Sequence, residues 1–512
     1  MTSENRNNRI AKNTLMLYFR QILILFVSLY TVRIVLDVLG IEDYGIYGAV
    51  GGLVALSAFL PGSLAMATQR FFSFSLGEKN TEKLNQTFSV NLILYLGVAV
   101  IAFALLQTIG LWFVDTQLVV PDGRFEAAKS LYFFASITFI LSVFTTPFMA
   151  IIMAHEDMKT YAYISIVEAF IKLGVVYLLQ YVDWDKLELY GLLVMCVGLI
   201  NALMYIGFCL YKYDECQFKK FYWNFTVFKE ILGFTGWTVF GQISTVARTH
   251  AVTLLLNQAF NPAVVAARAI SVQIASQVNI FSNNFNASLT PAIVKSYAAN
   301  ERQDMFSLII AGSKATFFLL WVFALPMMLK MELILGIWLT TAPSDAILFA
   351  RLALVESLIM SISMPLAAAA RAPGRMKGYE LSLGLMQIGI FIVAWIAVAK
   401  GAPAYSVFIV AIVANVLMFA VRLYLLNRLI TLPMMLFIKK TVLPVISIVL
   451  ASCIPTLLLN ELLPKGFYWS VLIIAFSFIF SSFSMYFIGL NKEWRLKVKN
   501  MAFVRINRLL NR

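Results

Sequence analysis

The chain has 512 residues and a net charge of +14. Hydrophobic residues make up 61% of it and charged residues only 13%, whereas about a quarter of the residues of a soluble protein are charged. Because the apolar residues form long continuous runs, the sequence excludes a soluble protein and a β-barrel and predicts an all-α polytopic membrane protein. The positive charge is better explained by the connections between spans than by nucleic-acid binding.

A membrane-spanning helix needs about 20 mostly apolar residues. By this measure the sequence predicts about fourteen transmembrane helices. The seventh and eighth are the most polar of these segments, so they are expected to line an interior rather than face lipid on all sides. In chain order the predicted spans are 13–39, 46–72, 88–114, 126–153, 160–181, 189–212, 231–258, 262–289, 307–330, 346–370, 380–400, 404–428, 437–459 and 468–490.

The connections between these spans differ in charge from one side of the membrane to the other. The N-terminus and every second connection hold most of the lysines and arginines, while the alternate connections are poor in them and include the acidic pair Glu42 and Asp43. By the positive-inside rule both termini are cytoplasmic. The first apolar run is too long for a signal peptide and is expected to be a retained helix, so we predict a multi-pass protein of the bacterial cytoplasmic (inner) membrane.

A weak repeat divides the predicted spans into two groups of six. Spans one and seven each end at a short outer turn, and the helix that follows each turn is rich in small residues. Both groups begin at the cytoplasm, so the repeat is parallel, with its axis along the membrane normal. The predicted parts are an N-lobe, a cytoplasmic linker, a C-lobe, two extra C-terminal helices and a basic cytoplasmic tail that lies on anionic lipid: 1–212, 213–230, 231–428, 429–490 and 491–512.

Catalytic chemistry has little support in the sequence. Its only two histidines, His155 and His250, belong to no cluster with acids or hydroxyls at helical spacing. The four cysteines lack metal-ligand spacing and are expected to be reduced. We therefore expect no catalytic residue, no metal and no cofactor.

Charged residues inside the predicted spans are the most informative feature of the chain. A charge at the centre of a bilayer costs at least ~2.5 to 3.5 kcal/mol, so such residues are functional candidates by default. Basic residues outnumber acids there, which indicates a cationic interior and an anionic cargo. The basic residues are Arg20, Arg33, Lys172, Arg248, Arg268, Lys314 and Arg351, and the acids are Asp37, Glu168 and Glu356.

Several of these charges have more than one explanation. Arg33 and Asp37 lie one helical turn apart and form either a helix-end salt bridge or part of a site. Glu168 and Lys172 repeat that spacing, as a structural pair, a cargo site or a proton-exchanging pair.

Arg248 and Arg268 have no acid nearby in the sequence and are expected at comparable depth. Either they bind cargo or they snorkel toward the outer surface. Arg351 is expected to pair with Glu356, and Lys314 and Arg20 to snorkel toward the cytoplasm. The substrate-binding candidates are thus Arg248, Arg268, Arg33, Lys172 and Arg351, and the coupling or ion-binding candidates are Glu168, Glu356 and Asp37.

Three stretches resemble a known family. The runs 38–47 (VLGIEDYGIY), 62–71 (GSLAMATQRF) and 234–241 (FTGWTVFG) are similar to those of Wzx-type polysaccharide flippases of the multidrug/oligosaccharidyl-lipid/polysaccharide exporter superfamily. The resemblance implies two six-helix lobes around a central cavity with alternating access. It also implies an undecaprenyl-pyrophosphate-linked oligosaccharide as cargo, flipped to the periplasmic leaflet for surface polysaccharide such as O-antigen in lipopolysaccharide. The implied partners are this carrier lipid, membrane lipids, and polysaccharide polymerase and assembly proteins.

Two alternatives remain open. A multidrug or cation antiporter of the same superfamily would need an acid-dominated cavity, the reverse of the charges found here. A membrane-embedded glycan polymerase or ligase usually has a large outer loop with arginine and histidine, which this chain lacks.

Overall fold

The computed structural model describes residues 3–490, apart from 56, 58, 119, 122, 219, 340–342 and 465, together with residue 495. Within these residues every regular element is helical. Twelve helices are long and apolar enough to cross a membrane, or thirteen if the bent pair Glu42–Val54 and Phe59–Glu78 forms one span. The chain is therefore an all-α multi-pass membrane protein. The predicted basic tail, 491–512, lies outside the described residues except for Arg495.

The count of fourteen spans is not confirmed. The seventh predicted span, 231–258, lies in α8 (Phe225–Ala259), which has 35 residues but is too polar to count among the apolar spans. Two of its polar residues, Arg248 and Thr249, line a cavity described below. The second predicted span, 46–72, differs as well, because it crosses the break in the bent pair Glu42–Val54 and Phe59–Glu78. The remaining predicted spans coincide with helical segments, and the ends differ by only a few residues in most of them because long apolar runs define them well.

The chain forms two compact units that interleave along the sequence. The first contains Met1–Ile243, Thr290–Arg302 and Gly374–Glu380, and the second contains Ser244–Leu289, Gln303–Pro373 and Leu381–Arg512. The first unit thus holds segments of both predicted lobes, because the long helices α8 and α9 pass from one unit to the other, whereas the second unit holds none of the predicted N-lobe. The predicted lobe boundaries stay a prediction.

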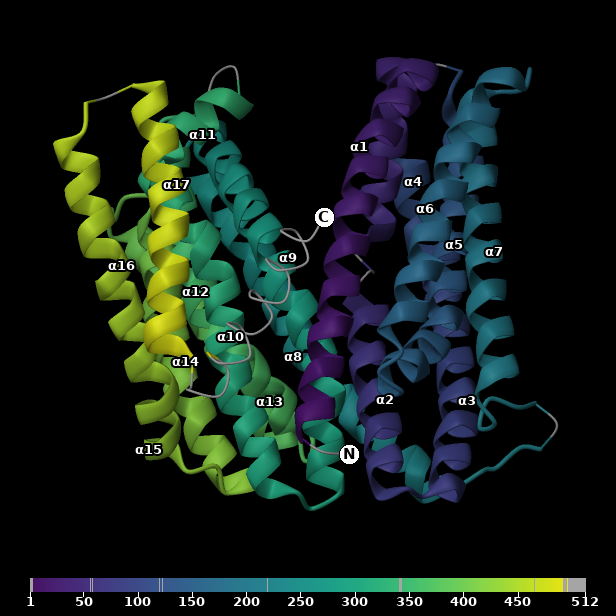
Figure 1. Ribbon diagram of the computed structural model, residues 1–512. Helices are drawn as coiled ribbons and strands as arrows, with labels where there is room; N and C mark the ends of the chain where they lie inside the picture. The colour runs from purple at the N-terminus through teal and green to yellow at the C-terminus, as the bar shows by residue number, and fades with distance from the viewer. Residues whose placement is uncertain are drawn as a thin grey trace, which may run out of the picture. The chain divides into compact units, whose positions relative to one another are not determined.

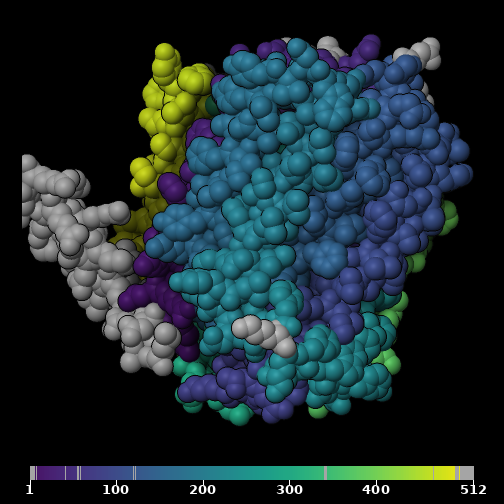
Figure 2. Space-filling view, turned by 90° about the vertical axis from the view of Figure 1, so that its right-hand side faces the viewer, coloured from purple at the N-terminus to yellow at the C-terminus, as the bar shows by residue number. Residues whose placement is uncertain are grey.

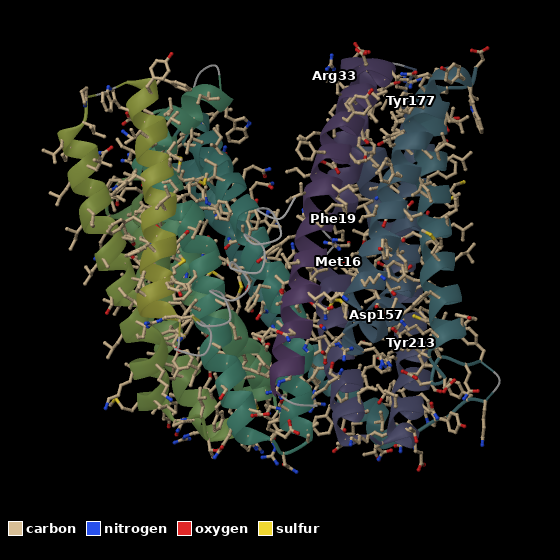
Figure 3. The ribbon with its side chains drawn as sticks, viewed as in Figure 1. Met16, Phe19, Arg33, Asp157, Tyr177 and Tyr213 are labelled. Atoms are coloured by element: carbon tan, nitrogen blue, oxygen red, sulfur yellow. The ribbon has the colours of Figure 1, made fainter. Side chains whose placement is uncertain are left out.

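The first unit is a helix bundle around α5, the most buried of its candidate spans (Figures 1 and 3). α5 packs against α1, α2, α3 and α7, and Figure 2 looks onto the face of the unit that α7 covers. Its helices are α1 (Ser3–Ala55), α2 (Phe59–Glu78), α3 (Thr81–Leu105), α4 (Leu111–Gln117), α5 (Phe125–Ala154), α6 (Met158–Tyr181), α7 (Lys186–Lys212) and the first turns of α8.

A kink at Gly40 occupies the place where a turn between the first two spans is predicted. The helix continues through it to Ala55, but Gly40 has φ 74° and ψ 175°, outside the helical region. A positive φ is tolerated by glycine and strained for other residues. Gly40 therefore separates the first predicted span from the second within α1.

A π-helical turn, η1 (Leu106–Gly110), joins α3 to α4. The hydroxyl of the buried Tyr132 donates a hydrogen bond of 2.6 Å to the carbonyl of Leu106. A Cβ atom on Gly110 would collide with that hydroxyl. The tyrosine thus reaches into the helix where a glycine leaves room, which is a recognised cause of π turns.

Arg124 ties three connections together at one end of the first unit. Its guanidinium forms ion pairs with Asp43, just after the α1 kink, and with Asp185, before α7. Hydrogen bonds to Asp185 and Asp43 raise the pKa of Arg124 despite its partial burial. Burial alone would raise the pKa of Asp185, but bonds from Arg124 and from the backbone N–H of Glu188 outweigh it and hold that pKa below its usual range. All three connections were predicted to lie on the same side of the membrane, and this cluster brings them together.

Replacing Asp185 with asparagine tests this cluster. Asparagine also caps helix N-termini, so Asp185→Asn removes mainly the charge. At neutral pH we expect the variant to lose roughly 1 kcal/mol of unfolding free energy. Because the folded-state pKa of Asp185 is lowered, wild type loses this advantage as the pH falls below about 4. Thermal unfolding in detergent from pH 7 to pH 3 measures the difference, with the exposed Asp183→Asn as matched control. An equal deficit at every pH would contradict the ion-pair explanation.

The second unit is built around α10, the most buried candidate span of the chain. α12 and α14 pack closely on each other, and α16 packs on α17. Its elements are the last turns of α8 and the greater part of α9 (Pro262–Ala298), then α10 (Arg302–Leu329), α11 (Met331–Trp338), α12 (Ala346–Arg371), α13 (Lys377–Ala399), α14 (Ser406–Ile430), α15 (Met434–Phe437), α16 (Leu443–Leu462) and α17 (Phe467–Ser484), with π turns at Ile438–Val442 and Met485–Gly489.

Polar contacts attach the last two long helices to α10. The indole of Trp321 donates to the hydroxyl of Ser452 at 3.0 Å, and Lys314 Nζ donates to the carbonyl of Gly489 at 3.0 Å. Lys314 is 9% exposed. The expected snorkelling of Lys314 is therefore wrong: its ammonium satisfies a carbonyl at the C-terminal end of a helix, where a positive charge is favoured.

Candidate functional site

The second unit encloses a polar cavity of about 240 Å³ among its membrane helices. Arg248 reaches it from α8, Arg268 from α9 and Glu356 from α12. Asn279 and Ser357 add polar groups to the same wall. The sequence predicted that the two arginines lie at comparable depth, and the structure places both on one cavity.

Glu356 is the centre of this cavity's hydrogen bonding. Its carboxylate lies 3.5 Å from a guanidinium nitrogen of Arg248, and both side chains are 16% exposed. The buried side-chain amide of Asn415, from α14, donates to the same carboxylate oxygen at 3.0 Å. Arg268 donates to the hydroxyl of Thr253 instead. The one carboxylate among the described lining residues is thus held by one arginine and one neutral donor.

The cavity carries an excess of positive charge. Two guanidinium groups line it, and Glu356 is the only acid among its described lining residues. At low dielectric an uncompensated cation attracts an anion far more strongly than it would in water. Guanidinium groups bind phosphate and carboxylate in a two-pronged manner, which suits an anionic ligand at this position.

The first unit holds a similar cavity, of about 330 Å³, between α1 and α6. Lys172 Nζ lies 2.6 Å from Glu168 Oε1, so the predicted one-turn pair forms. Arg20 lines the same cavity, donates to Ser165 at 3.5 Å and lies 4.7 Å from the centre of the Tyr161 ring. Arg20 therefore points into this cavity and not to the helix end expected from its sequence position. Here too two cations face one acid.

Arg33 and Asp37 lie apart from both cavities. Both side chains are exposed, and no ion pair joins them within the described part of the chain. Figure 3 shows Arg33 toward the end of α1 remote from the N-terminus, near Tyr177, whose hydroxyl lies 2.8 Å from that of Tyr30. The predicted helix-end salt bridge does not form there.

Arg351 does not pair with Glu356 as the sequence suggested. Its Nε donates a hydrogen bond of 2.8 Å to the carbonyl of Met328, in the last turn of α10. Arg351 is also absent from the described lining of the cavity. Its contact is that of a residue that stabilises a helix end.

A buried ion network that the sequence did not reveal surrounds Glu156, in the turn between α5 and α6. Glu156 is 7% exposed and has φ 61°, and its carboxylate binds Lys295 of α9 at 2.8 Å and Arg9 of α1 at 3.4 Å. Beside it, His155 bonds Glu215 at 2.6 Å. Figure 3 shows Asp157 close to Tyr213, to which it is hydrogen-bonded. No spacing signal joins positions so far apart in the chain.

Glu156→Gln should destabilise the protein. The substitution leaves two partly buried cations without their shared anion, and we expect a loss of about 1–3 kcal/mol. Thermal unfolding of the purified protein measures it. The matched control is Glu301→Gln, which breaks only a 3.6 Å contact between Arg6 and a carboxylate that is 55% exposed. Equal stability of the two variants would show that Glu156 does not hold the network together.

Metal binding has no support in the structure. Among the described side chains, no group of three or more His, Cys, Asp or Glu residues could hold a metal ion.

No family model matches the sequence, and no curated protein matches it either.

Solved structures identify the fold. An outward-facing multidrug resistance transporter of the MATE family, in the MOP superfamily, aligns with a TM-score of 0.72 at 14% identity, over 84% of this chain and 97% of that one. This chain has the MATE transporter fold. A MATE transporter in the straight conformation gives 0.71 at 15% identity, over 83% and 97% of the two chains.

A third similar structure is a MOP superfamily transporter from Pyrococcus furiosus, whose reversed binding-pocket polarity suggests a different function. It gives a TM-score of 0.70 at 14% identity, over 83% and 96% of the two chains. The similarity covers nearly the whole of each known structure, so this chain contains nearly the whole of their fold.

Proposed function

We propose that the protein is a transporter that flips an anionic lipid-linked oligosaccharide, carried on undecaprenyl pyrophosphate, from the cytoplasmic to the periplasmic leaflet. The observation that carries the proposal is the cavity that holds Arg248 and Arg268 against a single acid. A pyrophosphate diester carries about two negative charges, and arginine is the side chain best suited to bind it.

The first unit supports the same proposal. Its cavity places Arg20 and Lys172 beside a single acid, Glu168. Each unit therefore offers a cationic surface within membrane helices, where such charges are costly and usually functional. Hydroxyl and amide groups on the same walls, such as Ser165 and Asn279, suit the sugar hydroxyls of the cargo. Alternating access by the MATE-like fold would expose these surfaces to the two leaflets in turn.

A multidrug or cation antiporter is the second candidate, because the similar structures include multidrug transporters. A cationic drug would need a cavity dominated by acids, and here acids are outnumbered in both units. The Pyrococcus furiosus relative, in which reversed pocket polarity suggests a different function, illustrates that the sign of the pocket is informative in this fold. A glycan polymerase or ligase finds no support in a transporter fold.

The double variant Arg248→Ala, Arg268→Ala tests the cargo site. Loss of a charge-assisted contact costs about 1.5–3 kcal/mol, so each substitution should weaken binding roughly ten- to a hundredfold. Cells that depend on the variant should accumulate lipid-linked oligosaccharide in the inner leaflet, as in a deletion strain. Arg248→Lys should recover only part of the activity, because an ammonium group keeps the charge but cannot form the two-pronged contact.

The control is Arg33→Ala, which removes a cation from a membrane helix at a position outside both cavities. It should export normally. Normal export by a well-folded double variant would exclude this cavity as the cargo site, and its export of cationic drugs would favour the antiporter.

Coupling to an ion gradient is tested at Glu168. If this carboxylate takes up a proton or sodium ion when its bond to Lys172 opens, Glu168→Gln should fold but lose gradient-dependent transport. The double variant Glu168→Gln, Lys172→Met should fold equally well, since neutral groups often replace an ion pair without loss of stability. Transport in proteoliposomes with and without an imposed gradient measures the effect. Full gradient-driven transport by Glu168→Gln would leave the pair with a structural role only.

A further inference from the structure

A second basic pocket lies in the first unit and shares no lining residue with either cavity described above. It has a volume of about 370 Å³ and is formed by the first turns of α8 and the loop that leads into α13. Its side-chain walls come from Lys229, Glu230 and Trp237 on one side and from Arg375 and Lys377 on the other. None of these residues belongs to the set of charged residues that the sequence places inside the predicted spans.

The pocket is strongly cationic. Lys229, Arg375 and Lys377 are all exposed, and Glu230 is the only acid among the described lining residues. The ammonium of Lys377 lies 5.8 Å from the centre of the Trp237 ring. Lys377 is also the first residue of α13, and the first N–H groups of a helix have no partner within it. Side chains and backbone therefore favour an anion at the same place.

A buried arginine lies beneath the pocket. Arg70 of α2 is 7% exposed, and its guanidinium lies 4.6 Å from the ring centre of Phe71 and 5.7 Å from that of Phe234, which lines the pocket. Gly374, also in the lining, has φ 80°, and a Cβ atom there would come within 2.8 Å of an Arg70 nitrogen. The loop thus closes directly over the buried guanidinium, and only glycine fits at the point of contact.

Two glycines leave the pocket open to a compact ligand. Gly233 and Gly378 have no other atoms within 4 Å of the position that a Cβ would occupy. Trp237 forms part of the wall, and tryptophan is enriched where membrane helices meet the headgroup layer. Clusters of lysine and arginine at such a boundary attract anionic headgroups.

We propose that this pocket binds the phosphate group of an anionic lipid headgroup. The proposal does not rest on the transported cargo, because the pocket shares no residue with either cavity. The same phosphate chemistry is present in a membrane phospholipid and in free pyrophosphate. The test below has an arm for each.

Trp237 offers a direct optical readout. The purified full-length protein is titrated with short-chain phosphatidylglycerol, with short-chain phosphatidylcholine and with inorganic pyrophosphate, and tryptophan fluorescence is followed. We expect phosphatidylglycerol to give a saturable change that phosphatidylcholine does not give. Trp237→Phe should abolish the change while native mass spectrometry still detects the bound lipid. If pyrophosphate also binds saturably, the pocket recognises phosphate in general. If phosphatidylglycerol binds and pyrophosphate does not, the pocket recognises the intact lipid headgroup.

The deciding variant is the triple substitution Lys229→Gln, Arg375→Gln, Lys377→Gln. It should weaken phosphatidylglycerol binding at least about tenfold, since each basic residue near a headgroup contributes to affinity. Its matched control is Lys79→Gln, Lys400→Gln, Lys439→Gln, which removes the same charge from exposed positions outside the pocket. Equal affinities of the two triple variants, with both monodisperse and equally stable, would overturn the proposal, as would binding of the phosphatidylcholine with the same affinity.

Discussion

The ion pair between Arg248 and Glu356 is the interaction on which the second unit's interior depends. Two arginines within membrane helices would each carry a large desolvation cost if left alone. One carboxylate, itself fixed by Asn415, offsets the charge of one arginine and leaves the other with a hydroxyl partner. The result is a cavity that is stable enough to exist and still carries a charge that a ligand can neutralise.

The same arrangement recurs in the first unit with other residue types and other helices. A local pair, Glu168 with Lys172, takes the place of the long-range pair, and Arg20 supplies the additional charge. The one-turn pair is half exposed on its lysine side, so opening it costs less than opening a buried pair. Because of this difference, Glu168 is the better candidate for a residue that binds and releases an ion. Glu356 is the better candidate for a residue that stays in place as the countercharge of Arg248.

Sequence reasoning succeeded where the signal is local. Long apolar runs predicted most of the helices. It failed where the partner is distant: Glu356 and Arg248 are 108 residues apart, and Lys314 binds a backbone carbonyl 175 residues away. A carbonyl acceptor has no signature in the residue types, so the sequence left Lys314 to snorkel and gave Arg351 the wrong partner. The ion network of Glu156 was not predicted, because a residue in a turn follows no helical periodicity that would indicate its partners.

The cluster around Arg124 has a mechanical consequence. Because one planar cation is bonded to carboxylates that follow the α1 kink and precede α7, a displacement of any of these connections must carry the other two along. The cluster of Arg124, Asp43 and Asp185 can be loosened only by breaking the charge-assisted bonds of Arg124 to both carboxylates. At this end the first unit therefore behaves as a single stiff part, and bending is left to places such as Gly40, where the backbone already departs from the helix.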